Sequence, residues 1–231
     1  VYSGAVEVGQ GLLTMIAQVA AQETGVPLEQ VRVIAADTAL TPESGSSSAT
    51  RQTYFTGSAV KIACSELREH LFDVAQNRLG VHPLDIRIEN GVLYEAARPE
   101  NRVALSEVLA DVRRRGVKLE AAALFKPRTV EEHPETGLSP RAFITYLFGA
   151  HIAQVLVDTE TGQVTVERYI ACHDVGRAIN PVQVEGQIQG GVTQGIGMAL
   201  MEEVLMSPEG RMLNAGFTDY ILPGLSDVPE I

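Results

Sequence analysis

Strand-like and helix-like hydrophobic patterns alternate along this chain, and the alternation limits its possible folds more than any other feature. Alternating apolar residues predict short strands over 5–8 and 31–35. Apolar residues spaced three or four positions apart predict helices over 12–24 and from Thr53 to about Arg78. The first third of the chain is therefore expected to form strand, helix, strand and helix in that order.

Two hairpins indicate that the sheets are not purely parallel. Asn90-Gly91, a dipeptide that strongly favours a two-residue turn, separates apolar residues 86–89 from 92–94. Alternating residues 152–158 and 164–170 form a second such pair. Because hairpins pair strands antiparallel, we expect an α+β fold with mixed and antiparallel sheets and packed helices.

Three prolines in residues 126–142 predict a surface loop between two subdomains. The expected organisation is a first α+β subdomain over 1–125, the linker at 126–142, and a second α+β subdomain over 143–231. The chain opens at Val1 inside an apolar stretch and stops abruptly at Ile231. Both subdomains are therefore expected to belong to one larger domain that is truncated at both ends.

Composition excludes several classes of protein. Twenty-nine acidic and 18 basic residues give a net charge of -11, which disfavours binding to a nucleic-acid backbone. No apolar run reaches the roughly 20 residues that a membrane span needs. The chain has two cysteines and no signal segment, so we expect a cytoplasmic protein without a disulfide framework.

Two loops that precede helices are candidate ligand sites. Gly9-Gln10-Gly11 lies where a helix N-terminus would offer free N–H groups to an anion. Since Thr14 replaces the third glycine of a dinucleotide fingerprint, a structural turn is the alternative. Residues 45–51 combine hydroxyls with backbone donors and predict an anion-binding nest or a flexible serine linker.

The most unusual segment is a predicted helix that follows Asn180-Pro181 and runs toward Glu203. It carries five glycines, each of which costs a helix interior about 1 kcal/mol relative to alanine. Gln187 and Gln194 are seven residues apart and therefore share one helix face. The glycines indicate either space for a large ligand or a tight helix-packing face.

The segment Cys172-His173-Asp174 lacks the further ligands of a metal site. We expect Cys172 to be a small buried hydrophobe at the end of a strand, and His151 to have a structural role.

These motifs occur in one order over nearly the whole chain: Glu7-Val8-Gly9-Gln10-Gly11, Asp37-Thr38, the hydroxyl loop leading to Gly57-x-Ala59, Gly149-Ala150-His151, Asp174-x-Gly176-x-x-Ile179-Asn180-Pro181, and the Gln/Gly helix ending in Glu202-Glu203. Together they resemble the C-terminal part of the molybdenum-cofactor-binding (large) subunit of the xanthine dehydrogenase/aldehyde oxidase family. The resemblance implies the fold of a molybdenum-cofactor-binding domain.

The resemblance also implies a molybdenum hydroxylase. Such an enzyme uses molybdenum on a pyranopterin, either molybdopterin or its cytosine dinucleotide form, to hydroxylate an electron-poor carbon of a heterocycle or aldehyde with water. Electrons pass to iron–sulfur clusters and FAD on partner domains or subunits, and the assembled complex is expected to be a homodimer. Carried over position by position, the implied cofactor-binding residues are Gly9, Gln10, Gly11, Ser48, Ala49, Thr50, Gln187 and Gln194.

The sequence also departs from the family pattern. The general-base glutamate of the family is expected downstream of Ile231, and the glycine-rich and arginine-bearing motifs upstream are missing. No catalytic residue or metal ligand is therefore assigned, and the fragment is expected to be inactive alone. The alternatives are a non-catalytic scaffold that has lost the cofactor, and a nucleotide-phosphate binder, which the lack of an accompanying lysine disfavours.

Overall fold

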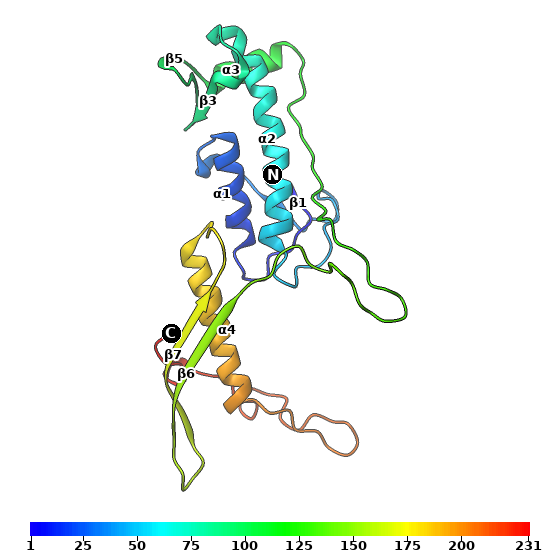
Figure 1. Cartoon of the computed structure of the whole chain (residues 1–231), viewed down its shortest axis with the longest axis vertical. Coiled ribbons are helices and arrows are strands. Elements are labelled where there is room, and N and C mark those ends of the chain that lie inside the picture. The colour runs from blue at the N-terminus through cyan, green and yellow to red at the C-terminus, as the bar shows by residue number, and fades with distance from the viewer. The chain divides into compact units, whose positions relative to one another are not determined.

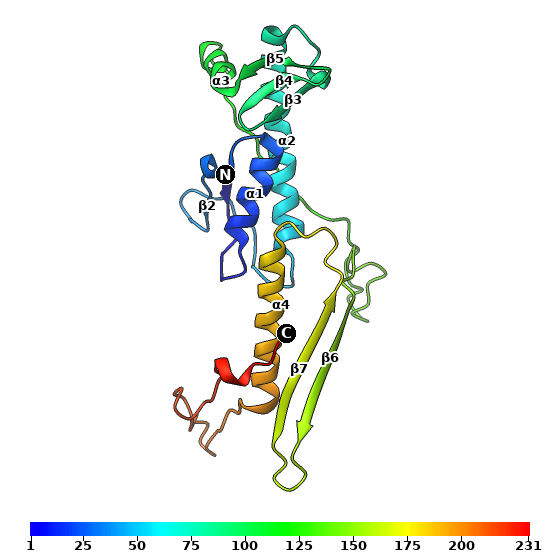
Figure 2. The ribbon, with the colours of Figure 1, turned by 90° about the vertical axis from the view of Figure 1, so that its left-hand side faces the viewer.

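The computed structural model describes all residues from Val1 to Ile231 and divides the chain into two compact units, Val1–Ile144 and Thr145–Ile231. Figures 1 and 2 show the ribbon of both units. The predicted α+β class is confirmed: α-helices combine with small sheets that are mainly antiparallel. None of the helices has both the length and the apolar composition of a membrane span.

The first unit begins with two helices packed side by side, α1 (Leu12–Thr24) and α2 (Gln52–Leu79). Both were predicted, and α1 ends at Gly25, whose φ of 65° is left-handed, as glycine readily allows. Their interface is a cluster of buried residues: Ala5, Leu12, Met15, Ile16, Ala20, Val60 and Cys64. This packing places the starts of both helices, and the loops before them, in the same unit.

The strands flanking α1 are shorter than predicted. β1 (Tyr2–Ser3) pairs in parallel with β2 (Ile34–Ala35), after the short 3-10 helix η1 (Leu28–Gln30). The predicted strand over 5–8 is wrong. The backbone N–H and C=O of Val6 form hydrogen bonds with the side chain of Ser47 and not with a neighbouring strand.

The far end of α2 carries a three-stranded antiparallel sheet of β3 (Ile86–Glu89), β4 (Val92–Glu95) and β5 (Arg98–Ala104). It follows the 3-10 helix η2 (Pro83–Asp85) and leads into α3 (Leu105–Arg114). The predicted turn is confirmed, because Asn90 and Gly91 have φ of 48° and 74°, as a type I′ turn requires.

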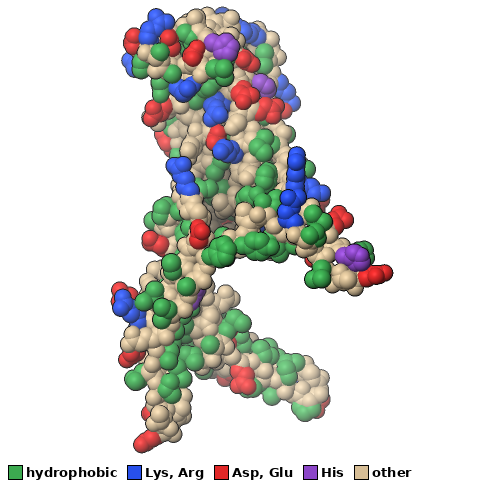
Figure 3. Space-filling model, viewed as in Figure 1, with side chains coloured by type: hydrophobic (Ala, Val, Ile, Leu, Met, Phe, Trp, Pro, Cys, Tyr) green, Lys and Arg blue, Asp and Glu red, His purple; other side chains and the backbone are tan.

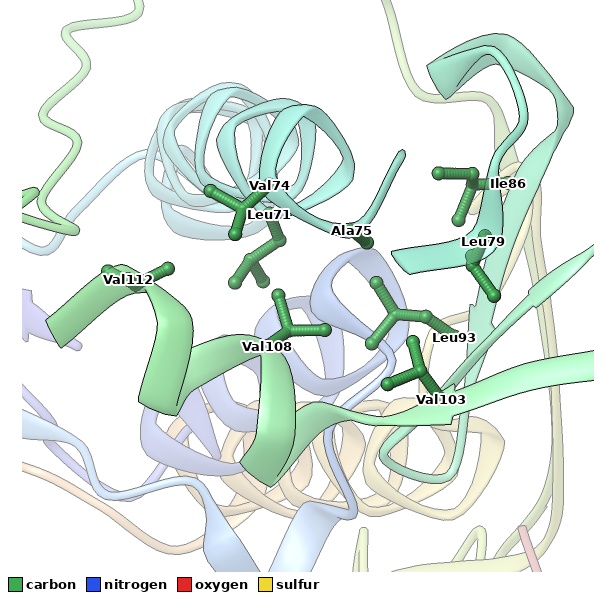
Figure 4. Packing of buried hydrophobic residues seen from close by; sticks show 9 residues of the cluster. All are labelled: Leu71, Val74, Ala75, Leu79, Ile86, Leu93, Val103, Val108 and Val112. Atoms are coloured by element: carbon green, nitrogen blue, oxygen red, sulfur yellow. The ribbon is translucent and has the colours of Figure 1, made fainter. Parts of the chain in front are cut away.

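Side chains from α2, the sheet and α3 form the second core of this unit (Figure 4). Its buried members are Leu71, Val74, Ala75, Leu79, Ile86, Leu93, Val103, Val108 and Val112. After α3, no helix or strand is formed until residue 149, a stretch that contains the predicted loop at 126–142.

The second unit consists of one hairpin and one long helix. β6 (Gly149–Val157) and β7 (Val164–His173) pair antiparallel, which confirms the predicted hairpin and lengthens it. α4 (Pro181–Leu200) begins as predicted, with the Asn180 side chain accepting a hydrogen bond from the Gln183 N–H at 3.2 Å. A 3-10 helix, η3 (Leu225–Asp227), lies near the end of the chain.

This second unit buries few apolar side chains. The buried ones are Val192 and Ile196 of α4, whereas Ile152 and Leu156 of β6 are 63% and 60% exposed. Hydrophobic side chains are open along the hairpin in the space-filling view (Figure 3). A two-stranded hairpin with so little buried surface is only marginally stable by itself in water.

Candidate functional site

The carboxylate of Glu7 occupies the N-terminus of α1. Its oxygens accept hydrogen bonds from the backbone N–H groups of Gly9 at 2.8 Å, Gly11 at 3.0 Å and Leu13 at 3.1 Å. Burial by itself would raise the pKa of Glu7, but these donors outweigh it and the pKa is lowered. The expectation that α1 offers free N–H groups to an external anion is therefore wrong, since the chain supplies the anion itself.

Gln10 shapes its own loop. Its Oε1 accepts from the Val8 N–H at 2.7 Å, and its Nε2 donates to the Val6 carbonyl at 3.0 Å. Gly9 and Gly11 on either side have φ of 103° and 81°, a region that glycine tolerates best. The amide retains one Nε2 hydrogen and one Oε1 lone pair, so it can contact a ligand while it holds the turn.

The hydroxyl loop lies against this glycine loop through Ser47. The Ser47 Oγ donates to the Val6 carbonyl at 2.7 Å and accepts from the Val6 N–H at 3.1 Å. The two loops that contain the predicted residues Gly9–Gly11 and Ser48–Thr50 are thus joined within one unit. Sequence reasoning did not single out Ser47, because nothing local distinguishes it from the serines on either side.

The hydroxyl loop is strained where it enters α2. Ala49 and Thr50 both have left-handed backbone, with φ of 53° and 55°. For a β-branched residue such as Thr50 this conformation is rare, and strain of about 1–3 kcal/mol per residue tends to be kept at ligand-binding sites. Consecutive backbone N–H groups in a turn of this kind can form a concave anion site.

The N-terminus of α2 is open, in contrast to that of α1. It has no side-chain cap and no acidic residue in its first turn. Arg51, the residue before the helix, donates to the Ser46 carbonyl at 3.3 Å and stacks on the Phe55 ring at 4.7 Å. The helix dipole and this guanidinium both favour an anion here. The helix start leaves room for an anion, and the anion-binding nest at residues 45–51 stays a prediction.

In the second unit, Gln187 and Gln194 are both exposed on α4. Gly186, Gly190, Gly191 and Gly195 border them, and a Cβ added at any of the four would meet no atom within 4 Å. Gly197 is different, since an added Cβ would lie 2.7 Å from the Pro223 ring. Only Gly197 therefore serves packing inside this unit, and the other four leave a smooth open face beside the two glutamines.

A hollow of about 490 Å³ also borders α4. Gln189 and Thr193 line one wall, and the chain segment 223–231 lines the other. At 100° per residue, Gln189 projects about 140–160° away from Gln187 and Gln194, whereas Thr193 lies within about 20° of Gly186. The hollow therefore meets the glycine-lined face at one edge, and Gln189 points away from the two glutamines.

The hairpin carries a small polar cluster. His151 Nδ1 lies 2.8 Å from the Tyr169 hydroxyl, and His151 Nε2 lies 2.6 Å from His173 Nε2. No group of three or more His, Cys, Asp or Glu side chains is arranged to hold a metal ion. Cys172 is exposed, so the expectation that it is buried is wrong. Side chains of β7 alternate between half-buried and exposed positions, and Cys172 lies on the exposed side.

The chain is similar to known proteins along nearly its whole length. A family model described as the molybdopterin cofactor-binding domain matches residues 1–229. The chain is 32% identical over 237 residues to the putative xanthine dehydrogenase molybdenum-binding subunit of Escherichia coli, covering 100% of this chain and 30% of that protein. It is 34% identical to the nicotine 6-hydroxylase large subunit of Paenarthrobacter nicotinovorans, covering 98% of this chain and 27% of the relative.

Solved structures show the same fold. Quinoline 2-oxidoreductase from Pseudomonas putida 86 superposes with a TM-score of 0.81 at 29% identity, over 98% of this chain and 29% of that chain. The Cu,Mo-CO dehydrogenase superposes with a TM-score of 0.80 at 26% identity, over 98% of this chain and 27% of that chain. The chain thus spans 30% or less of the length of these relatives. Because the family model matches residues 1–229, the chain belongs to the molybdopterin cofactor-binding domain family.

Proposed function

We propose that this chain is the molybdopterin-binding portion of a xanthine dehydrogenase-like molybdenum hydroxylase. The observation that carries the proposal is the junction of the glycine loop and the hydroxyl loop at the open N-terminus of α2. A pyranopterin carries a phosphate and a ring edge rich in hydrogen-bonding groups. Backbone N–H groups, hydroxyls and neutral amides match those groups without needing a positive net charge.

The residues present fit the cofactor. The Oγ of Ser44, in the same loop, is buried and has no hydrogen-bond partner, and a buried polar atom without a partner is costly. Within the first unit, Ser48, Ala49 and Thr50 would hold the phosphate or pterin edge, and Gly9–Gly11 would lie along the other side. The family resemblance implies Gln187 and Gln194 of the second unit as further amide contacts. When bound, the cofactor supplies the redox centre at which the substrate carbon is hydroxylated.

The chain's own residues would bind and orient the cofactor, and no side chain is proposed as the general base. The second unit buries only Val192 and Ile196 among its apolar residues, which supports the view that this chain forms one wall of a larger site and is inactive alone. Iron–sulfur and FAD partners, a dimeric complex and a small heterocyclic or aldehyde substrate belong to the same proposal. Both cysteines are free thiols, which supports a reducing, cytoplasmic location.

The experiment measures molybdenum by mass spectrometry and pterin by fluorescence after oxidation, in the purified complex that contains this chain. Gln10→Ala and Gln194→Ala are expected to lower both contents, whereas Gln189→Ala, on the opposite side of α4, serves as the matched control. Unchanged molybdenum in both site variants would overturn the assignment of these residues. Wild-type protein without molybdenum or pterin would instead favour the scaffold that has lost its cofactor.

A further inference from the structure

We infer that Ser47 is a positioning residue that holds the two loops of the proposed cofactor site in register before the cofactor binds. The inference rests on the proposed function for its consequence, but the coupling of the loops is a property of the chain itself. Ser47 lies one residue before the proposed contact Ser48, and its partner Val6 lies three residues before Gly9.

The Ser47 hydroxyl makes every hydrogen bond of which it is capable. A serine hydroxyl has one donor and two acceptor lone pairs. Ser47 Oγ donates to the Val6 carbonyl at 2.7 Å and accepts from the Val6 N–H at 3.1 Å and from the Gln52 Nε2 at 2.9 Å. It therefore has no capacity left for a ligand, which separates a positioning role from a contact role.

The third of these bonds connects the loops to α2. Gln52 is the first residue of that helix, and its Oε1 accepts a hydrogen bond from the Thr56 hydroxyl at 2.5 Å. Thr56 thus fixes the orientation of the Gln52 amide, and Gln52 fixes that of Ser47. This series of hydrogen bonds holds the glycine loop against the N-terminus of α2, where the proposed anion site lies.

Neighbouring hydroxyls do not do the same. Ser46 Oγ lies 3.1 Å from Ser48 Oγ in an exposed pair, and neither side chain hydrogen-bonds to the glycine loop. Removal of the Ser47 hydroxyl would leave the Val6 N–H without its partner and leave the Val6 carbonyl to Gln10 alone. The two loops would then be free to move relative to each other. A ligand that contacts both loops would have to order them on binding, and this cost weakens binding.

The test compares Ser47→Ala with Ser47→Thr, which keeps the hydroxyl, and with Ser106→Ala, which removes an exposed serine hydroxyl on α3 of the same unit. The exchange rate of the Val6 amide hydrogen is measured in the cofactor-free chain. In the complex, the molybdenum content that remains after gel filtration measures how fast the cofactor dissociates. We expect Ser47→Ala to raise both the Val6 exchange rate and cofactor dissociation about tenfold, since both hydrogen bonds that join the loops through Val6 are lost, together with the bond from Gln52. Ser47→Thr is expected to restore both, and Ser106→Ala to leave both at wild-type values.

Three results are decisive. Unchanged Val6 exchange in Ser47→Ala would overturn the coupling of the loops. Faster exchange with unchanged molybdenum retention would overturn the positioning role. If Ser47→Ala lowers the melting temperature of the whole chain and Ser47→Thr fails to restore cofactor retention, the role is merely structural and the inference is also overturned. Wild-type protein without cofactor would contradict the proposed function alone, because the exchange comparison needs no cofactor.

Discussion

The guanidinium of Arg78 in α2 holds the carboxylate of Asp111 in α3 through two hydrogen bonds, from Nε to Oδ2 at 2.5 Å and from Nη2 to Oδ1 at 3.1 Å. Asp111 is 8% exposed and also pairs with Arg114, whereas Arg78 reaches Glu107 at 2.8 Å with its Nη1. This group of charges ties the two helices together beside the core of Figure 4.

The Arg78–Asp111 pair predicts an acid-sensitive first unit. The hydrogen bond from Arg78 lowers the pKa of Asp111 to about 2, against the opposing effect of burial and with a further contribution from Arg114. A carboxyl whose pKa is lowered in the folded state stabilises the fold at pH values above its pKa in the unfolded chain, which is 3.8 for aspartate. That stabilisation is lost as the pH falls toward the folded-state pKa of about 2. Asp111→Asn should be less stable at pH 7 and should lack this acid-dependent loss.

Urea unfolding followed by circular dichroism at pH 7 and at pH 3 measures that difference. Asp73→Asn on α2 is the control, because Asp73 is exposed and its side chain makes no ion pair. An equal dependence on pH in the wild type and in Asp111→Asn would rule out Asp111 as its source.

Glu7→Gln should weaken the start of α1. The variant loses the charge that accepts three backbone N–H groups, and loss of a helix cap costs about 0.5–2 kcal/mol. Since the pKa of Glu7 is lowered from 4.5, its contribution is present above that pH and fades below it. The difference in unfolding free energy between the variant and the wild type, measured with urea, should therefore be smaller at acid pH. The control is Glu43→Gln at an exposed glutamate, which should leave the unfolding free energy unchanged.

The glycines of α4 should behave in two opposite ways. Gly190→Ala is expected to stabilise this chain by about 0.5–1 kcal/mol, because alanine favours the helix and the added Cβ meets open space. Gly197→Ala is expected to destabilise it by about 1–3 kcal/mol through overpacking against Pro223. Thermal unfolding of both variants tests this. In the loaded complex, Gly190→Ala should nevertheless lower molybdenum content, and full retention would show that no ligand approaches this face.

The core of the first unit should depend on Leu93, which is fully buried at the centre of the sheet. Leu93→Ala is expected to cost about 2–5 kcal/mol of unfolding free energy, the sum of lost burial and the cavity left behind. Leu124→Ala, at a leucine that is 87% exposed, should change it by no more than about 0.5 kcal/mol. Comparable losses in both variants would contradict the placement of Leu93 in the core.

Local patterns were sufficient for much of the fold. Hydrophobic spacing predicted α1 and α2, Asn90-Gly91 predicted the β3–β4 hairpin, and Asn180-Pro181 predicted the start of α4. In each case the determining interactions join residues close in the chain. The order of the motifs also indicated the family, and the match over residues 1–229 confirms that family.

The errors occurred where side-chain contacts outside the local hydrophobic pattern decide the outcome. The alternation at 5–8 predicted a strand, but Ser47, 41 residues away, takes both backbone groups of Val6. Cys172 was expected to be buried because it ends a strand, although burial depends on what covers the hairpin. Free N–H groups were expected at α1, yet Glu7 turns back to bind them.

The sequence by itself determined the helices, the hairpins and the family, because these depend on periodicity, turn residues and the order of motifs. Only the tertiary structure decided which helix N-terminus is open, which glycines serve packing, and that Ser47 joins the two loops. The first depends on the Glu7 side chain, which accepts from backbone N–H groups two to six residues ahead of it. The other two depend on contacts between segments farther apart, Gly197 with Pro223 and Ser47 with Val6. A hydroxyl or carboxylate can satisfy any donor within about 3 Å, and only the folded chain determines which donor that is.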